Sequence, residues 1–83
     1  MEILYTSRFL RAYKKLPAEV KNKVEKKEKI IKKDIFDKAL KTHKLHGDFS
    51  GFYAFSIDHK TRIIFQLENT TVVFYDIGDH DIY

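Results

Sequence analysis

The hydrophobic and polar positions at the start of the chain follow the spacing of a short strand and then of a helix. The apolar residues 3–5 end at Thr6 and Ser7, which predicts a strand followed directly by a helix N-cap. An amphipathic helix of about three turns is predicted next, because four apolar residues recur at i, i+3, i+4 and i+7. These residues are Phe9, Ala12, Tyr13 and Leu16.

A second helix is predicted to begin at Pro17, because proline interrupts a helix but fits the first turn of a new one. Val20, Val24 and Ile31 share one side of this helix, and lysines occupy much of the remainder. Such a narrow apolar stripe is typical of a helix that lies on another layer. The two helices therefore form a hairpin around Leu16 and Pro17.

The spacing changes to two after Gly51, which predicts strands joined by short polar turns. Residues 34–50 lack a clear period, and we expect one helical turn near residues 37–40 and then a loop. The alternating segments are residues 53–58, 62–67 and 72–77, with turns at 58–61 and 68–71. The predicted fold class is α+β with the order β-α-α-β-β-β, two N-terminal helices packing on one face of an antiparallel sheet. Residues 1–83 form a single domain, as this length indicates.

The net charge of +4 conceals a strong asymmetry. Residues 8–44 hold fourteen basic and five acidic residues, a net charge of +9, whereas the rest of the chain carries −5. A cationic half of this kind indicates a polyanionic partner, nucleic acid before a membrane surface, although a solvated lysine-rich helix gives the same pattern. The sequence contains no cysteine, which excludes disulfides, a thiolate nucleophile and thiolate metal sites. No targeting segment or membrane span is visible, so we expect a cytoplasmic protein.

The turn positions of the predicted meander bring several reactive side chains to one edge of the sheet. If the last hairpin turns at residues 69–70, Arg62 lies opposite about Ile77, and His80 follows at the same edge. Tyr83 can fold over this edge, and His43 lies in the loop that leads into the meander. We therefore expect His43, Arg62, His80 and Tyr83 to converge. An imidazole base, a guanidinium and a second imidazole suit metal-free cleavage of an RNA phosphodiester.

Simpler interpretations stay open for each of these residues. Arg62 can pair with Asp58 or Asp76 at the end of its strand, and His59 can be ordinary polar surface. A different arrangement would join three imidazoles in a zinc site: His43, His46 and His80.

Six segments, in this order over the whole chain, resemble the RelE/ParE toxin superfamily, most closely its YafQ/YoeB-like mRNA interferases. They are Leu4-Tyr5-Thr6 with Phe9, Leu16-Pro17, residues 40–47, residues 50–53, Arg62-Ile63-Ile64-Phe65 and residues 76–83. The resemblance implies a toxin of a type II toxin–antitoxin pair, an endoribonuclease that cuts mRNA in the ribosomal A site without a metal or other cofactor. It implies an antitoxin partner, and contact with operator DNA only through the antitoxin complex. Apart from the resemblance, the lack of an apolar span indicates no membrane contact, and the small size of the domain indicates that the free toxin is a monomer.

The resemblance also assigns roles by position. His43 falls where relatives keep a base or phosphate contact, and Arg62 on the arginine that holds the scissile phosphate. His80 matches the general acid and Tyr83 the aromatic residue that orients the nucleotide. The expected RNA contacts are Lys26, Lys33, Lys41, Lys44 and His46.

Two departures and one alternative function remain. Ser56 and Lys60 stand where relatives of the YafQ kind carry a further histidine and an acid, and His46 is a possible substitute. A ParE-like inhibitor of DNA gyrase without nuclease activity would share the same fold.

Overall fold

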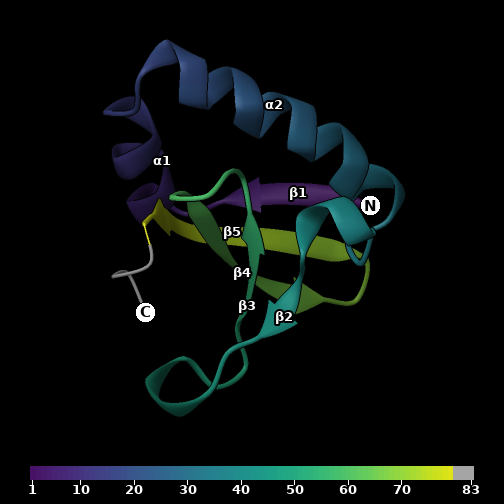
Figure 1. Cartoon of the computed structure of the whole chain (residues 1–83). Helices are drawn as coiled ribbons and strands as arrows, with labels where there is room; N and C mark the ends of the chain where they lie inside the picture. Colours follow the sequence, from purple (N-terminus) through teal and green to yellow (C-terminus); the bar gives the residue numbers. More distant parts are fainter. Residues whose placement is uncertain (80–83) are drawn as a thin grey trace.

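The computed structural model describes residues 1–79, so the expected acid His80 and the terminal Tyr83 lie outside the described residues. Two α-helices, two short 3-10 helices and five strands follow one another along the chain (Figure 1). In order they are β1 (Glu2–Tyr5), α1 (Ser7–Lys14), α2 (Ala18–Lys33), η1 (Lys38–Leu40), β2 (His43–Lys44), η2 (Gly47–Phe49), β3 (Tyr53–Ser56), β4 (Arg62–Glu68) and β5 (Thr71–Gly78).

The strands form one mixed sheet in the order β1-β5-β4-β3-β2. Strands β3 to β5 pair antiparallel as predicted, the unpredicted β2 pairs antiparallel with β3, and β1 pairs parallel with β5. The helix hairpin separates β1 from the meander, so no tight turn sets the relative direction of β1. The predicted α+β class is confirmed, and the sheet is mixed rather than wholly antiparallel. The extra strand β2 has two residues, too few for a periodicity to reveal it in the sequence.

Both helices begin where the sequence predicts. The Thr6 hydroxyl oxygen accepts a hydrogen bond from the Phe9 N–H at 3.0 Å, which makes Thr6 the N-cap of α1. The same hydroxyl donates to the carbonyl oxygen of Tyr75 at 2.8 Å and so fastens the start of α1 to β5. Pro17 caps α2 without a side-chain hydrogen bond.

The main core lies between the helix layer and one face of the sheet. Phe9 of α1 and Val24 and Ile31 of α2 are almost completely buried there. Figure 1 shows α1 and α2 on the same side of the sheet. The strands of the meander and the residue that follows β3 contribute aromatic and branched side chains: Phe55, Ile57, Ile63, Phe65, Val72, Phe74 and Ile77.

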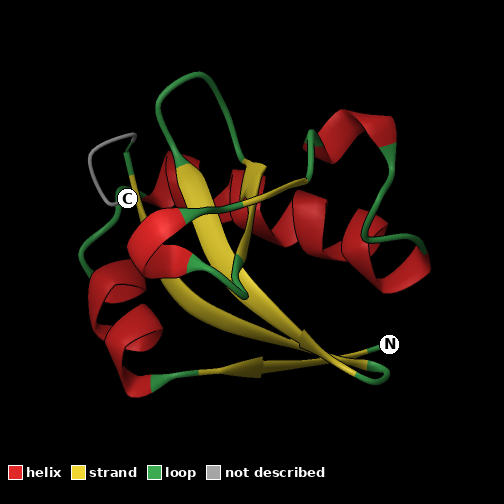
Figure 2. Ribbon diagram, turned by 90° about the horizontal axis from the view of Figure 1, so that it is seen from below, coloured by secondary structure: helices red, strands yellow, loops and turns green. Residues whose placement is uncertain are grey.

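A second, smaller core covers the other face of the sheet, which we call the far face. Leu45, Ala54 and Ile64 are buried in it. The loop that contains η2 folds across this face, as Figure 2 shows. Phe49 and Phe52 come from that loop and pack against the cluster. The segment between α2 and β3 is therefore an ordered cover for the sheet and not only a connection.

A bulge shifts the register of the last hairpin by one residue. Phe65 lies opposite Phe74, but Ile64 lies opposite Asp76, so Tyr75 is the extra residue of β5. Arg62 therefore faces Gly78 instead of the predicted Ile77. An unbroken ladder would place Arg62 opposite Ile77, and a bulge has no simple sequence signal.

Candidate functional site

Arg62, the first residue of β4, is directed toward the turn that joins β3 to β4. Its Nη1 group donates to the carbonyl oxygen of Asp58 at 2.6 Å and to that of Thr61 at 3.2 Å. Both acceptors are backbone atoms. These two bonds are therefore not the ion pair with the Asp58 carboxylate that the simpler interpretation predicts. These hydrogen bonds fix the position of the guanidinium at the end of the sheet.

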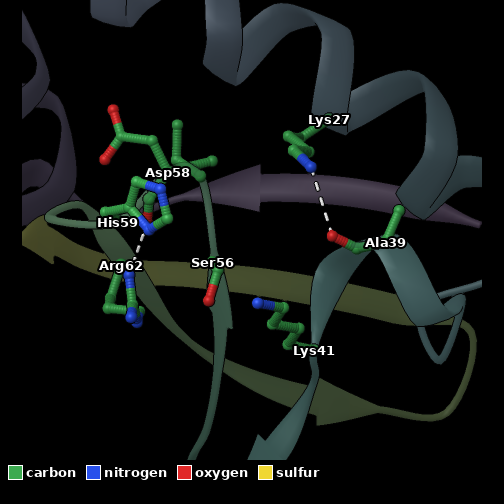
Figure 3. Close-up of a pocket in the computed structure, with 8 residues that line it drawn as sticks. Lys27, Ala39, Lys41, Ser56, Asp58, His59 and Arg62 are labelled. Carbon is green, nitrogen blue, oxygen red and sulfur yellow. Dashed lines mark hydrogen bonds between the residues drawn. The ribbon is translucent and has the colours of Figure 1, made fainter.

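Arg62 lines a pocket of about 220 Å³, here called the Arg62 pocket. Its members come from α2, η1, β3, β4 and their connections (Figure 3): Lys27, Ala39, Lys41, Ser56, Ile57, Asp58, His59 and Arg62. The lining thus includes two lysines, an arginine, a histidine and one carboxylate. The volume is below the ~300–1,000 Å³ of most small-molecule sites and suits a phosphate with part of its sugar.

The lysines of the Arg62 pocket come from two different directions. Lys41 has a left-handed backbone, φ 54°, at the end of η1. Figure 3 shows its ammonium group pointing toward Ser56, with Arg62 beyond it. On the other side, the Lys27 ammonium donates to the carbonyl oxygen of Ala39 at 3.2 Å and thereby holds η1 against α2. Because Ser56 lies between cationic groups, its hydroxyl can add a neutral hydrogen-bond donor to an anion bound there.

Asp58 is the carboxylate of the Arg62 pocket, and its oxygens already have partners. Oδ1 accepts from the N–H groups of Lys60 at 2.9 Å and Thr61 at 2.8 Å, and Oδ2 pairs with Lys23 at 3.3 Å. Partial burial acts to raise the pKa of Asp58. The hydrogen bonds from Thr61, Lys60 and Lys23 outweigh it and lower the pKa to about 2. Asp58 therefore stays ionised at neutral pH as a structural acceptor, and the pocket keeps its cationic character.

Replacing Asp58 by asparagine is expected to destabilise the protein at pH 7 and to matter progressively less in acid. A folded pKa of about 2 lies below the unfolded value of about 3.9, so the ionised group contributes stability above pH ~4 that is lost as the pH falls toward 2. Urea unfolding at several pH values measures this difference for Asp58→Asn and for the control Asp48→Asn, which alters an exposed residue. A pH-independent loss of stability in Asp58→Asn would contradict the expectation.

His43 lies on the far face, on the same side of the sheet as Ser56 and Arg62. It pairs with Ala54, whose side chain is in the far-face core, and Arg62 lies two residues before Ile64 of that core. Strand spacing places the Cα atoms of His43 and Arg62 about 12 Å apart. The structure thus places these two predicted residues on one face of the sheet, with β3 between their strands.

A hydrogen bond to the backbone selects the tautomer of His43. Nδ1 lies 3.0 Å from the carbonyl oxygen of Lys41. A carbonyl oxygen only accepts, so Nδ1 carries the hydrogen, and in the neutral imidazole Nε2 then carries the lone pair. The same bond places the His43 ring beside Lys41, which lines the Arg62 pocket.

The other predicted RNA contacts lie away from the Arg62 pocket. Lys44 and His46 line a second pocket of about 370 Å³, together with Phe52 and Tyr53. Lys44 pairs with Tyr53 at the opposite end of β3 from Ser56. Two further lysines, Lys26 and Lys33, are exposed on α2.

Sequence reasoning missed two basic members of the Arg62 pocket, Lys27 and His59. Lys27 follows Val24 by three residues and precedes Ile31 by four, a spacing that places it beside the buried stripe of α2. That spacing is a usable signal. His59, which the sequence suggests to be ordinary surface, lines the pocket because the β3–β4 turn folds back toward Arg62. Only the turn conformation reveals this.

A metal centre has no support among the described residues. Within residues 1–79, no three histidine or acidic side chains are grouped so that they could hold a metal ion. The zinc arrangement considered from the sequence includes His80, which lies outside this range. No helix in the described part of the chain is long and apolar enough to cross a membrane.

Several toxins and toxin–antitoxin complexes of known structure share this fold. The chain is similar to YafQ from E. coli strain BL21(DE3), with a TM-score of 0.82, 16% identity, and coverage of 98% of this chain and 94% of that one. It is also similar to the YoeB/ParE toxin from Agrobacterium tumefaciens, with a TM-score of 0.81, 18% identity, and coverage of 96% and 99%. The toxin in the E. coli DinJ-YafQ toxin-antitoxin complex gives a TM-score of 0.79, 18% identity, and coverage of 98% and 93%. A comparison with curated protein sequences gives no match.

A family model covers nearly the whole chain. The family described as bacterial toxin of type II toxin-antitoxin system, YafQ, matches residues 1–82. The protein is therefore a toxin of the type II toxin–antitoxin class. Within this class it belongs to the YafQ family, which confirms the RelE/ParE-superfamily resemblance of the sequence.

Proposed function

We propose that this toxin is a ribosome-dependent mRNA endonuclease. The observation that carries the proposal is the Arg62 pocket, where Arg62, two lysines, His59 and the already hydrogen-bonded Asp58 line a space that suits a phosphate with part of its sugar. A guanidinium with a fixed position is well suited to hold a phosphodiester and the negative charge that develops on its oxygens during cleavage. The YafQ family and its fold supply the toxin context.

The chemistry follows from the placement of His43 and Arg62. His43 Nε2 takes the proton from the ribose 2′-hydroxyl, and the 2′-oxygen attacks the adjacent phosphorus. Arg62 and Lys41 stabilise the charge on the non-bridging oxygens. The bond to the 5′-oxygen breaks, and an acid protonates that oxygen, which leaves a 2′,3′-cyclic phosphate and a 5′-hydroxyl. His80 is proposed as this acid and Tyr83 as the residue that orients the nucleotide; both lie outside the described residues.

The surrounding basic surface is proposed to bind RNA. The second pocket combines the ammonium group of Lys44 and the imidazole of His46 with aromatic walls, a composition that suits a nucleotide. The exposed lysines of α2, including Lys26 and Lys33, are proposed to contact ribosomal RNA in the A site. The proposed partners are thus the ribosome and mRNA, and the proposed location is the cytoplasm, where translation takes place.

A cognate antitoxin is the proposed protein partner. DinJ-YafQ and the YoeB-YefM complex from Staphylococcus aureus are related toxins solved together with their antitoxins. In this chain, large exposed hydrophobic side chains gather on the edge strand β1 and on α1: Leu4, Tyr5 and Leu10, which are 47%, 42% and 50% exposed. Apolar side chains next to an open sheet edge are typical of a surface that a partner covers.

Induced expression of the toxin, with mapping of mRNA 5′ ends, tests the proposed function. New 5′ ends are expected at discrete codon positions, only in translated messages, and they should vanish when initiation is blocked. The neighbouring small acidic reading frame, co-expressed where one exists, is expected to suppress them. Intact mRNA together with relaxed plasmid DNA would contradict the nuclease proposal and favour the gyrase-inhibiting alternative.

A further inference from the structure

Asp76 is the one buried charged residue among residues 1–79, with 8% of its surface exposed. Oδ2 accepts from Arg8 Nε at 3.0 Å, and Oδ1 accepts from the Ile77 N–H at 2.8 Å. A carboxylate removed from water is costly unless it is paired and hydrogen-bonded. Arg8 of α1 supplies this pairing across the boundary between the helix and β5.

Arg8 is held on two sides but stays accessible. Its side chain is 57% exposed, and its guanidinium carbon lies 5.3 Å from the centre of the Tyr75 ring. The ion pair with Asp76 uses Nε–H, one of the five N–H donors of an arginine. The Asp76 carboxylate and the Tyr75 ring thus orient the guanidinium. The hydrogen bond to Asp76 does not use the Nη groups of Arg8.

Asp76, the strand residue of the Arg8–Asp76 pair, lies close to Arg62 in the β4–β5 ladder. Asp76 is opposite Ile64, and Arg62, two residues before Ile64, is opposite Gly78. Asp76 and Arg62 are therefore diagonal neighbours, with Cα atoms about 7–8 Å apart. Because Tyr75 packs in the far-face core, Arg8 is held at the same face that carries Arg62 and His43.

We propose that Arg8 is a second phosphate-binding residue, which holds the mRNA phosphate adjacent to the one cleaved, with Asp76 as its positioning residue. The proposal rests on the proposed nuclease function. A planar guanidinium recognises phosphate through paired N–H donors, and fixing its plane in advance lowers the cost of ordering it on binding. The pair with Asp76 has no net charge, so the contribution of Arg8 is short-range hydrogen bonding rather than long-range attraction.

Binding to two kinds of ribosome tests this inference. One kind carries an mRNA whose A-site codon has 2′-O-methyl groups, which removes the attacking hydroxyl; the other carries no mRNA. Arg8→Gln is expected to weaken binding to the programmed ribosomes about 5- to 10-fold and to leave binding to the mRNA-free ribosomes unchanged. Arg11→Gln changes another exposed arginine of α1 and is expected to match the wild type on both.

Other results of the same experiment distinguish a failure of the Arg8 proposal from a failure of the nuclease proposal. Equal binding of Arg8→Gln and wild type to programmed ribosomes overturns the role of Arg8, and so does an equal loss on both kinds of ribosome. Wild-type binding that does not depend on mRNA contradicts the proposed function itself. Arg8→Lys keeps a positive charge to pair with Asp76 but lacks the planar guanidinium. It therefore provides the test if Arg8→Gln does not fold. It is expected to retain stability and still lose affinity for programmed ribosomes, whereas full affinity in a folded Arg8→Lys overturns the proposal.

Discussion

Arg62→Ala is expected to lower the rate of mRNA cleavage on translating ribosomes by about 10²–10³-fold. Loss of a single preorganised donor to a developing oxyanion typically has an effect of this size. The guanidinium is held by two backbone carbonyl groups in a pocket with Lys41 and His59, so its charge is already in position when a phosphate binds. Quantified 5′ ends from programmed ribosomes measure the rate. Arg62→Lys is expected to be intermediate, because an ammonium keeps the charge but not the planar donor set.

The control for Arg62 is Lys60→Ala, which removes an exposed cation from the same turn. It is expected to cleave at close to the wild-type rate. Thermal unfolding must accompany both variants, because Arg62 also holds the carbonyl oxygens of Asp58 and Thr61 and its loss costs about 1–2 kcal/mol. A folded Arg62→Ala with the wild-type rate would show that the Arg62 pocket is not the catalytic phosphate site.

Phe74→Ala is expected to destabilise the fold by about 3–5 kcal/mol, the usual result of truncating a fully buried aromatic side chain. Phe74 is fully buried, and its ring lies 5.3 to 5.7 Å from the rings of Tyr5, Phe9 and Phe55, which belong to β1, α1 and β3. A domain of this size has a total stability on the order of 4–12 kcal/mol, so much of it depends on this side chain. Urea unfolding of the purified variant at 25 °C measures the loss.

Phe36→Ala is the matched control, because Phe36 is 58% exposed and touches the ring of Tyr53 only at its edge. Its expected cost is below about 1 kcal/mol. Similar losses in the two variants would mean that the aromatic cluster around Phe74 is not the centre of the core. Loss of toxicity in Phe74→Ala but not in Phe36→Ala would then follow from unfolding, unlike the effect expected for Arg62→Ala.

The local patterns of the chain predict its elements because each pattern is a local physical preference. Thr6 and Pro17 are the N-cap residues of α1 and α2, in keeping with the preference of threonine and proline for helix starts. The alternation after Gly51 predicts three strands. Nothing local predicts that β1 joins the sheet beside β5, since that pairing links residues about seventy positions apart. The bulge at Tyr75, which shifts the partner of Arg62 to Gly78, also depends on long-range packing.

The candidate site shows the same division. Arg62, Lys41 and His43 are identifiable from residue type, position and family resemblance. Local patterns do not reveal that Lys27 and His59 line the pocket, that the bond to Lys41 places the hydrogen of His43 on Nδ1, or that Arg8 pairs with Asp76. The sequence by itself determined the α+β elements, the charge asymmetry and the family. Only the tertiary structure decided which cations share a pocket and which carboxylate is buried, because those facts depend on contacts between segments far apart in the chain, and local preferences carry no information about them.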